Sequence, residues 1–100
     1  MKPPAHRILY TREAKRIIGK LDPSVRKLVR KAVGSLIEEP ERGKPLSHEL
    51  AGLRSLRTSD YRIIYHAKGS DLVILVVTIG HRREVYKRLG RLLDLAGRKK

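Results

Sequence analysis

The feature that most constrains the fold is an apolar run near the end of the chain. Residues 72–79 read Leu-Val-Ile-Leu-Val-Val-Thr-Ile, so apolar side chains stand at both odd and even positions. A strand of this kind buries both of its faces, which places it inside a sheet and not at the edge. We therefore expect a central strand at residues 71–79, with the rest of the chain supplying its neighbours and the helices that cover them.

Three other segments have the composition of strands. They are residues 6–10, 53–58 and 61–67, and the last two flank a tight turn at Ser59-Asp60. Alternation divides the side chains of residues 61–67 between two faces. Tyr61, Ile63 and Tyr65 share one face, and Arg62, Ile64 and His66 share the other. One face has to lie against helices, which leaves the other free to form an exposed concave surface.

Three stretches carry apolar residues at helical spacing. The first follows Thr11, a favourable N-cap residue, and the second opens at Asp22-Pro23 and ends before Pro40. The third begins at Glu84. Its apolar stripe could be core or a docking site for a partner, and we favour core. The stripe consists of Val85, Leu89, Leu92, Leu93 and Ala96.

The predicted order is β-α-α-β-β-β followed by a C-terminal helix. This order favours an α+β fold in which a two-helix hairpin packs on a small, mainly antiparallel, four-stranded sheet. Neither repeats nor a linker divide the 100 residues, so we expect one domain at residues 1–100 with a flexible basic tail at about residues 97–100.

The chain is strongly basic. Its 24 Lys and Arg residues against 10 Asp and Glu give a formal net charge of +14, whereas a magnitude of about 2–8 keeps most small domains soluble. The excess favours a polyanionic partner, which is nucleic acid or an acidic protein before an anionic membrane surface. The absence of cysteine excludes disulfides and cysteine-based metal sites and fits a reducing compartment, so we expect a cytoplasmic protein without a membrane segment.

Motifs of metal and cofactor enzymes are absent from the sequence. It has no glycine-rich phosphate loop, no histidine pair at metal-ligand spacing and no close carboxylate pair, so we expect neither metal nor cofactor. Cations and one phenol remain on the predicted strands and just after them. They are Arg54, Arg57, Arg62, Arg82, Arg83 and Tyr86. Arginines bind phosphate oxygens through two N–H groups, and a tyrosine ring stacks on a base, so this set suits a phosphodiester.

Cleavage of RNA needs little beyond such a cluster, because RNA carries its own nucleophile in the 2′-hydroxyl. The enzyme has to stabilise negative charge and move two protons. Arg62 and Arg82 are candidates for the first task, and His81 or Tyr86 for the second. Each also has a structural alternative: an ion pair for Arg62, helix packing for Tyr86 and a turn for His81.

Several short motifs together resemble the RelE/ParE toxin superfamily of bacterial and archaeal toxin–antitoxin systems. They are Leu50-Ala51-Gly52, Leu56-Arg57, the run from Asp60 to Tyr65, and the run from Gly80 to Tyr86. With the helical hairpin that ends in Glu-Glu-Pro, the resemblance covers nearly the whole chain. For the RelE branch it implies an endoribonuclease that needs no metal, cuts mRNA in the ribosomal A site, leaves a 2′,3′-cyclic phosphate and is neutralised by an acidic, RelB-like antitoxin.

The resemblance also implies roles for single residues. Arg62 matches the family's phosphate-stabilising arginine, Arg82 the arginine assigned to the leaving group or to charge stabilisation, and Tyr86 the tyrosine that orients the nucleotide. The best-known members carry two lysines on the second strand, one of them in proton abstraction, where this chain has Leu53 and Ser55. The general base therefore stays open among His81, Lys44 and Arg54. The expected RNA-binding residues are Arg54, Arg57, Arg83 and Lys44.

Two alternatives remain beside the nuclease. The ParE branch shares the fold but inhibits DNA gyrase, and a relative without activity could simply bind nucleic acid. The combination of Arg62, Arg82 and Tyr86 favours the RelE branch. The partners that we expect are then mRNA, the ribosome, an antitoxin and, through the toxin–antitoxin complex, operator DNA. Ribosome contact would use the basic face of the second helix, which carries Arg26, Lys27, Arg30 and Lys31.

Overall fold

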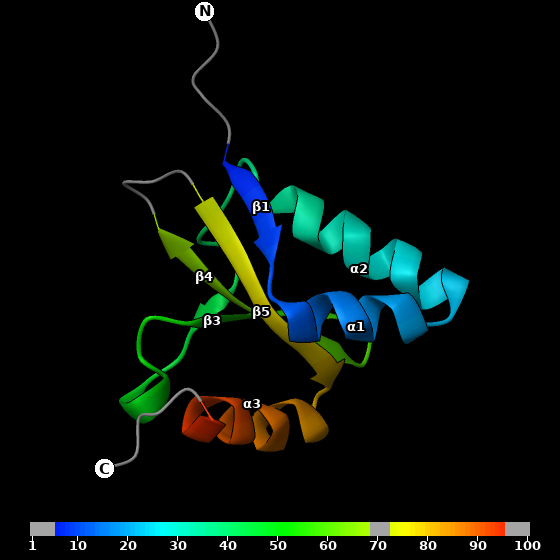
Figure 1. Cartoon of the computed structure of the whole chain (residues 1–100). Coiled ribbons are helices and arrows are strands. Elements are labelled where there is room, and N and C mark those ends of the chain that lie inside the picture. The colour runs from blue at the N-terminus through cyan, green and yellow to red at the C-terminus, as the bar shows by residue number, and fades with distance from the viewer. Residues whose placement is uncertain (1–5, 69–72, 96–100) are drawn as a thin grey trace, which may run out of the picture.

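A computed structural model of the chain describes residues 6–68 and 73–95. Within these ranges a mixed five-stranded sheet carries helices on both faces (Figure 1). The elements in chain order are β1 (Arg7–Tyr10), α1 (Arg12–Lys20), α2 (Pro23–Ser35), β2 (Lys44–Pro45), the 3-10 helix η1 (His48–Leu50), β3 (Arg54–Thr58), β4 (Tyr61–Lys68), β5 (Val73–His81) and α3 (Glu84–Leu95). The α+β class and the predicted element order are confirmed.

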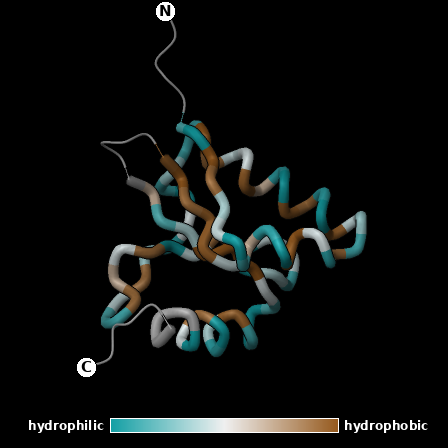
Figure 2. Tube along the Cα trace, viewed as in Figure 1, coloured by the Kyte–Doolittle hydropathy of each residue, from teal (hydrophilic) through white to brown (hydrophobic). Residues whose placement is uncertain are grey.

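The strand order is β1-β5-β4-β3-β2, with β1 parallel to β5 and every other neighbouring pair antiparallel. The apolar strand β5 therefore pairs on both edges, as its composition predicted. Its residues Ile74, Val76 and Ile79 are fully buried. Figure 2 shows the hydrophobic path of this strand through the centre of the molecule.

The helix ends follow the predicted signals in part. The Thr11 Oγ1 atom accepts a hydrogen bond from the Ala14 N–H at 3.0 Å and so caps α1. Asp22 precedes Pro23 at the start of α2, but its side chain makes no capping hydrogen bond. The helix α2 ends at Ser35, several residues before the proline that was expected to stop it.

A fifth strand, β2, lies where a loop was predicted. Residues 44–45 pair with Ser55 and Arg54 of β3. Two residues that include a proline carry no sequence signal for a strand, and the contacts that hold them come from elsewhere in the chain. The Tyr65 hydroxyl donates to the Pro40 carbonyl at 2.7 Å and accepts from the Gly43 N–H at 2.9 Å. These bonds fix the approach to β2 and make the sheet five-stranded rather than four-stranded.

Two hydrophobic clusters lie on opposite faces of the sheet. Ile63 and Tyr65 pack with α1 and α2, whereas Ile64 packs with Val85 and Leu89 of α3. The alternation predicted for β4 is thus confirmed, and the two α3 residues are fully buried, so this part of the helix is core. The expectation of an open concave face is corrected, because α3 covers part of it. The side chains of residues 92 and 93, residue 96 and the predicted basic tail lie outside the described part of the structure.

Candidate functional site

Strand register brings two arginines together on the α3 face of the sheet. Arg57 of β3 lies directly opposite Arg62 of β4, and Arg62 in turn lies opposite Gly80 of β5. Directly opposed residues project to the same side of a sheet, and two like charges in this arrangement repel each other. A bound anion would reduce that repulsion.

Arg62 has a buried donor without a partner. Its Nε atom is shielded from solvent and makes no hydrogen bond, and among the described residues no carboxylate forms an ion pair with it. The structural alternative of an ion pair is therefore not met in this part of the chain. A buried donor left unsatisfied costs about 1–3 kcal/mol, and such a cost in a native protein calls for an explanation such as a ligand.

Tyr86 lies beside the arginine pair on the same face. Its hydroxyl donates to the Ser55 Oγ atom at 3.2 Å, and its side chain is 37% exposed. Ser55 itself is buried on β3, two positions before Arg57. The bond orients the phenol, and the exposed part of the ring is available for stacking on a planar group.

Helix α3 approaches the sheet closely at Gly80. A Cβ atom at this position would lie 2.7 Å from Arg88 Nη1 and 3.4 Å from Val85 Cβ. Arg88 donates from Nη1 to the Ile79 carbonyl at 2.6 Å, and its Nε atom lies 3.7 Å from Glu13 Oε2 on α1. Arg88 thus fastens α3 to the end of β5. It was not among the predicted site residues, and no local pattern in the sequence marks it.

Two further arginines stand at the carboxyl end of β5. Arg82 and Arg83 are exposed in the turn before α3, and the Arg82 N–H donates to the Asp60 carbonyl at 3.1 Å. With Asp60, His81 and Glu84 they line an open pocket of about 480 Å³. Neither arginine forms an ion pair among the described residues, so both guanidiniums are available to an anionic ligand.

Lys44 also belongs to this face. The register of β2 sets it directly opposite Ser55, the residue that receives the Tyr86 hydroxyl. Directly opposed residues have Cβ atoms about 4.5–5.5 Å apart, and the Lys44 side chain is exposed. The amine of Lys44 therefore lies near Ser55, one of the two positions where the best-known family members carry a lysine.

Arg54 and His81 lie on the other face of the sheet from Arg62, although His81 also lines the pocket with Arg82 and Arg83. Arg54 lies opposite Tyr65, on the α1–α2 face, and its Nη1 atom donates to the Gly43 carbonyl at 2.6 Å. His81 lies opposite Tyr61, and the two ring centroids are 4.9 Å apart. Both side chains therefore have contacts on the side of the sheet away from Arg62.

The available chemistry is cationic. Lys44, Arg57, Arg62 and Tyr86 share the α3 face, and Arg82 and Arg83 stand at the end of β5. Four arginines, one lysine and one phenol suit a phosphodiester with an adjacent base. Within residues 6–68 and 73–95, no group of three His, Asp or Glu side chains is placed to hold a metal ion. None of the helices in these ranges combines the length and the apolar character that a membrane crossing requires.

Comparison with known proteins gives this cluster a context. Residues 6–86 match the family described as the ParE toxin of the type II toxin–antitoxin system parDE. Toxin RelG of Mycobacterium tuberculosis is 36% identical over 83 residues, which span 81% of this chain and 95% of the relative. Toxin RelE of the same organism is 36% identical over 55 residues, 54% of this chain and 57% of that toxin.

Solved structures agree with the sequence relatives. The toxin–antitoxin complex RelBE2 from M. tuberculosis contains a chain that is 33% identical, with a TM-score of 0.72 over 79% of this chain and 100% of that one. The isolated E. coli RelE toxin, 23% identical, has the same fold, with a TM-score of 0.67 over 89% of this chain and 99% of that one.

The fold, the cationic face and the matched relatives define a toxin of a type II toxin–antitoxin system. The chain belongs to the RelE/ParE toxin superfamily, as its motifs indicated.

Proposed function

We propose that this toxin is an endoribonuclease that inhibits translation by cutting mRNA, without a metal ion, in the ribosomal A site. The observation that carries the proposal is the unpartnered, buried Nε donor of Arg62, opposite Arg57 and on the same face as Tyr86. A ribonuclease has a direct use for two opposed arginines, which can bind the phosphate that gains charge in the transition state.

The reaction follows from what RNA itself supplies. The 2′-oxygen attacks the adjacent phosphorus, the O2′–P bond forms and the P–O5′ bond breaks, which leaves a 2′,3′-cyclic phosphate and a 5′-hydroxyl. Arg62 and Arg57 bind the non-bridging oxygens, where negative charge increases in the transition state. One preorganised donor of this kind typically contributes about 10²–10³ in rate. We assign the departing 5′-oxygen to Arg82, at the end of β5, whose guanidinium stabilises the negative charge while water supplies the proton.

The proton from the 2′-hydroxyl needs an acceptor. Of the three candidates for this role, Lys44 lies on the face of Arg62, while Arg54 and His81 make their contacts on the other face. We assign the role to Lys44, whose amine accepts the proton in its neutral form. Tyr86, held by its bond to Ser55, positions the nucleotide by stacking against its base.

The assignment of Lys44 predicts a specific loss. Lys44→Met keeps the length of the side chain but removes the amine, and we expect RNA cleavage to fall by about 10²–10⁴-fold, the usual contribution of a proton-transfer group. Lys20→Met, which removes an exposed lysine from the end of α1, is the matched control and should cleave like the wild type. Equal cleavage by the two variants would rule out Lys44 as the acceptor.

The antitoxin that we expect is an acidic, RelB-like segment that covers the cationic face. The matched M. tuberculosis structure is itself a toxin–antitoxin complex. A disordered acidic segment that folds on this face would neutralise the paired charges of Arg57 and Arg62 and shield them from RNA. Operator DNA would be bound through the resulting complex.

Two assays run in parallel test the function. Purified toxin is added to a translating extract and to a gyrase supercoiling reaction. We expect protein synthesis to stop in the first and supercoiling to continue in the second, and we expect Arg82→Ala to restore synthesis. Unimpaired synthesis together with loss of supercoiling would instead support the ParE-like alternative, and no effect in either assay would support simple binding.

A further inference from the structure

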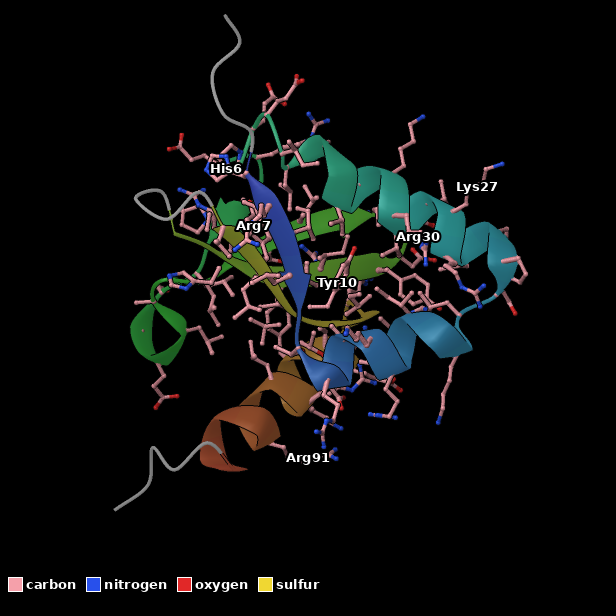
Figure 3. All side chains as sticks on the ribbon, turned by 45° about the horizontal axis from the view of Figure 1, so that its top comes forward. His6, Arg7, Tyr10, Lys27, Arg30 and Arg91 are labelled. Carbon is pink, nitrogen blue, oxygen red and sulfur yellow. The ribbon has the colours of Figure 1, made fainter. Side chains whose placement is uncertain are left out.

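A second pocket lies on the far side of the sheet from the proposed cleavage site. It opens between β1, α1 and α2 and has a cavity volume of about 640 Å³. Its lining consists of Tyr10, Lys15, Ile18, Gly19, Arg26 and Arg30. Figure 3 shows Tyr10 of β1 and Arg30 of α2 in the space between the strand and the helices. Cavities of about 300–1,000 Å³ commonly hold small molecules.

One part of this pocket is apolar and able to receive a flat ring. Tyr10 contributes a half-buried aromatic ring, and Ile18 contributes a buried aliphatic side chain next to it. Gly19 adds no side chain at all, and a Cβ atom built there would meet no other atom within 4 Å. The space beside Gly19 is therefore open, and a ring that enters it would meet aromatic and aliphatic surface.

The other part of the pocket is cationic and contains no carboxylate among its lining residues. Arg26 is held in place by α1, since its Nε atom donates to the Ile18 carbonyl at 3.1 Å and its Nη2 atom to the Leu21 carbonyl at 3.0 Å. These bonds leave Nη1 without a partner in the described part of the chain. Lys15 and Arg30 likewise form no ion pair there. Three cations, one of them preorganised, suit a phosphate group.

Tyr10 adds a neutral donor between the two parts. Burial raises the pKa of its phenol above the ordinary value of 10.0, and the nearby charge of Arg30 lowers it to a smaller extent. The hydroxyl therefore keeps its proton at physiological pH. It makes no hydrogen bond within residues 6–68 and 73–95, so it can donate to a ligand.

We propose that this pocket binds a nucleoside phosphate, with the base against Tyr10 and Ile18 and the phosphate on Lys15, Arg26 and Arg30. The nucleoside phosphate is either a free nucleotide or one nucleotide of an RNA chain. The site is separate from the arginines of the α3 face, and the proposal does not depend on RNA cleavage.

The test measures binding at this pocket alone. Adenosine 5′-monophosphate, an RNA hexamer with 2′-O-methyl groups and inorganic phosphate are titrated separately into the protein, and the Ile18 methyl signals are followed by NMR. Because Ile18 lies in this pocket, RNA bound at the α3 face does not disturb the readout. We expect saturable shifts with the nucleotide, with the RNA, or with both, and weaker binding of inorganic phosphate.

Two variants and a matched control distinguish binding in this pocket from general electrostatic attraction to the basic protein. Arg30→Gln removes a cation from the pocket, and Gly19→Leu places a side chain in the open space. We expect each to weaken binding by at least about tenfold, which corresponds to about 1.4 kcal/mol. Arg12→Gln removes the same charge from an exposed position of α1 outside the pocket and should change affinity by less than about twofold.

The outcomes identify the source of the ligand. Saturation by the mononucleotide assigns the pocket to free nucleotides, and saturation by the hexamer alone assigns it to RNA. The proposal is overturned if neither ligand shifts the Ile18 signals, if inorganic phosphate binds as tightly as the nucleotide, or if Arg12→Gln weakens binding as much as Arg30→Gln. Translation inhibition by Gly19→Leu is assayed separately: loss of nucleotide binding with inhibition intact shows that the pocket is independent of the proposed cleavage.

Discussion

The Tyr65 hydroxyl is expected to account for a large share of the stability of the segment that carries Lys44. The side chain is fully buried, and its hydroxyl donates to the Pro40 carbonyl and accepts from the Gly43 N–H. Tyr65→Phe keeps the ring but removes both bonds. A buried group that loses its partner costs about 1–3 kcal/mol. The Pro40 carbonyl is only half-buried and can turn to water, so we assign most of the cost to Gly43 and expect about 2 kcal/mol.

Thermal unfolding followed by circular dichroism measures this cost. For a domain of this size each kcal/mol lowers the midpoint by about 4–8 °C, so a loss of about 2 kcal/mol corresponds to roughly 8–16 °C. Tyr61→Phe is the matched control, because the Tyr61 hydroxyl makes no hydrogen bond within the described residues, and we expect a change below about 0.5 kcal/mol. Equal midpoints for the two variants would refute the reasoning, as would a Tyr65→Phe loss below about 0.5 kcal/mol.

Three further predictions concern stability, two of them in the same region. A Cβ atom at Gly43 would lie 2.8 Å from both the Tyr65 ring and its hydroxyl, so Gly43→Ala should destabilise the fold by about 1–3 kcal/mol in urea unfolding. At Gly34, in contrast, a Cβ atom meets nothing within 4 Å. Gly34→Ala should therefore stabilise the fold by about 0.5–1 kcal/mol. Burial raises the pKa of Tyr65 above its ordinary value of 10.0. The protonated phenol therefore adds stability that is fully present below pH 10.0 and is lost as the pH rises through the raised pKa. Above about pH 10 the free energy of unfolding should fall less steeply with pH for Tyr65→Phe than for the wild type, and parallel curves would contradict this.

The parts of the fold that the sequence predicted are those with strong periodicity. The apolar run of β5 required burial on both faces, and alternation along β4 separated Ile63 from Ile64 across the sheet, as the two clusters confirm. The strand β2 escaped prediction because two residues have no period. The segment that leads into it is held by Tyr65 and Arg54, which come later in the sequence.

The division of the candidate residues between the two faces of the sheet was predictable from the sequence only in part. Arg54 and Arg57 are three residues apart on one strand, so alternation alone already separates their side chains. The face on which His81 lies depends on strand register, because its partner Tyr61 is known only once β4 and β5 are paired. The same holds for Lys44, whose place beside Ser55 follows from a strand that the sequence did not reveal.

The central claim is that the arginine pair of the α3 face cleaves RNA, and primer extension on an mRNA in a translating extract tests it most directly. Wild type and Arg62→Met are compared, with Arg12→Met as a matched control that removes an exposed arginine of α1. We expect the wild type and the control to cut within codons and leave 5′-hydroxyl ends, and Arg62→Met to lose the cuts by about 10²-fold or more. Equal cutting by Arg62→Met, or intact mRNA with the wild type, would contradict the claim.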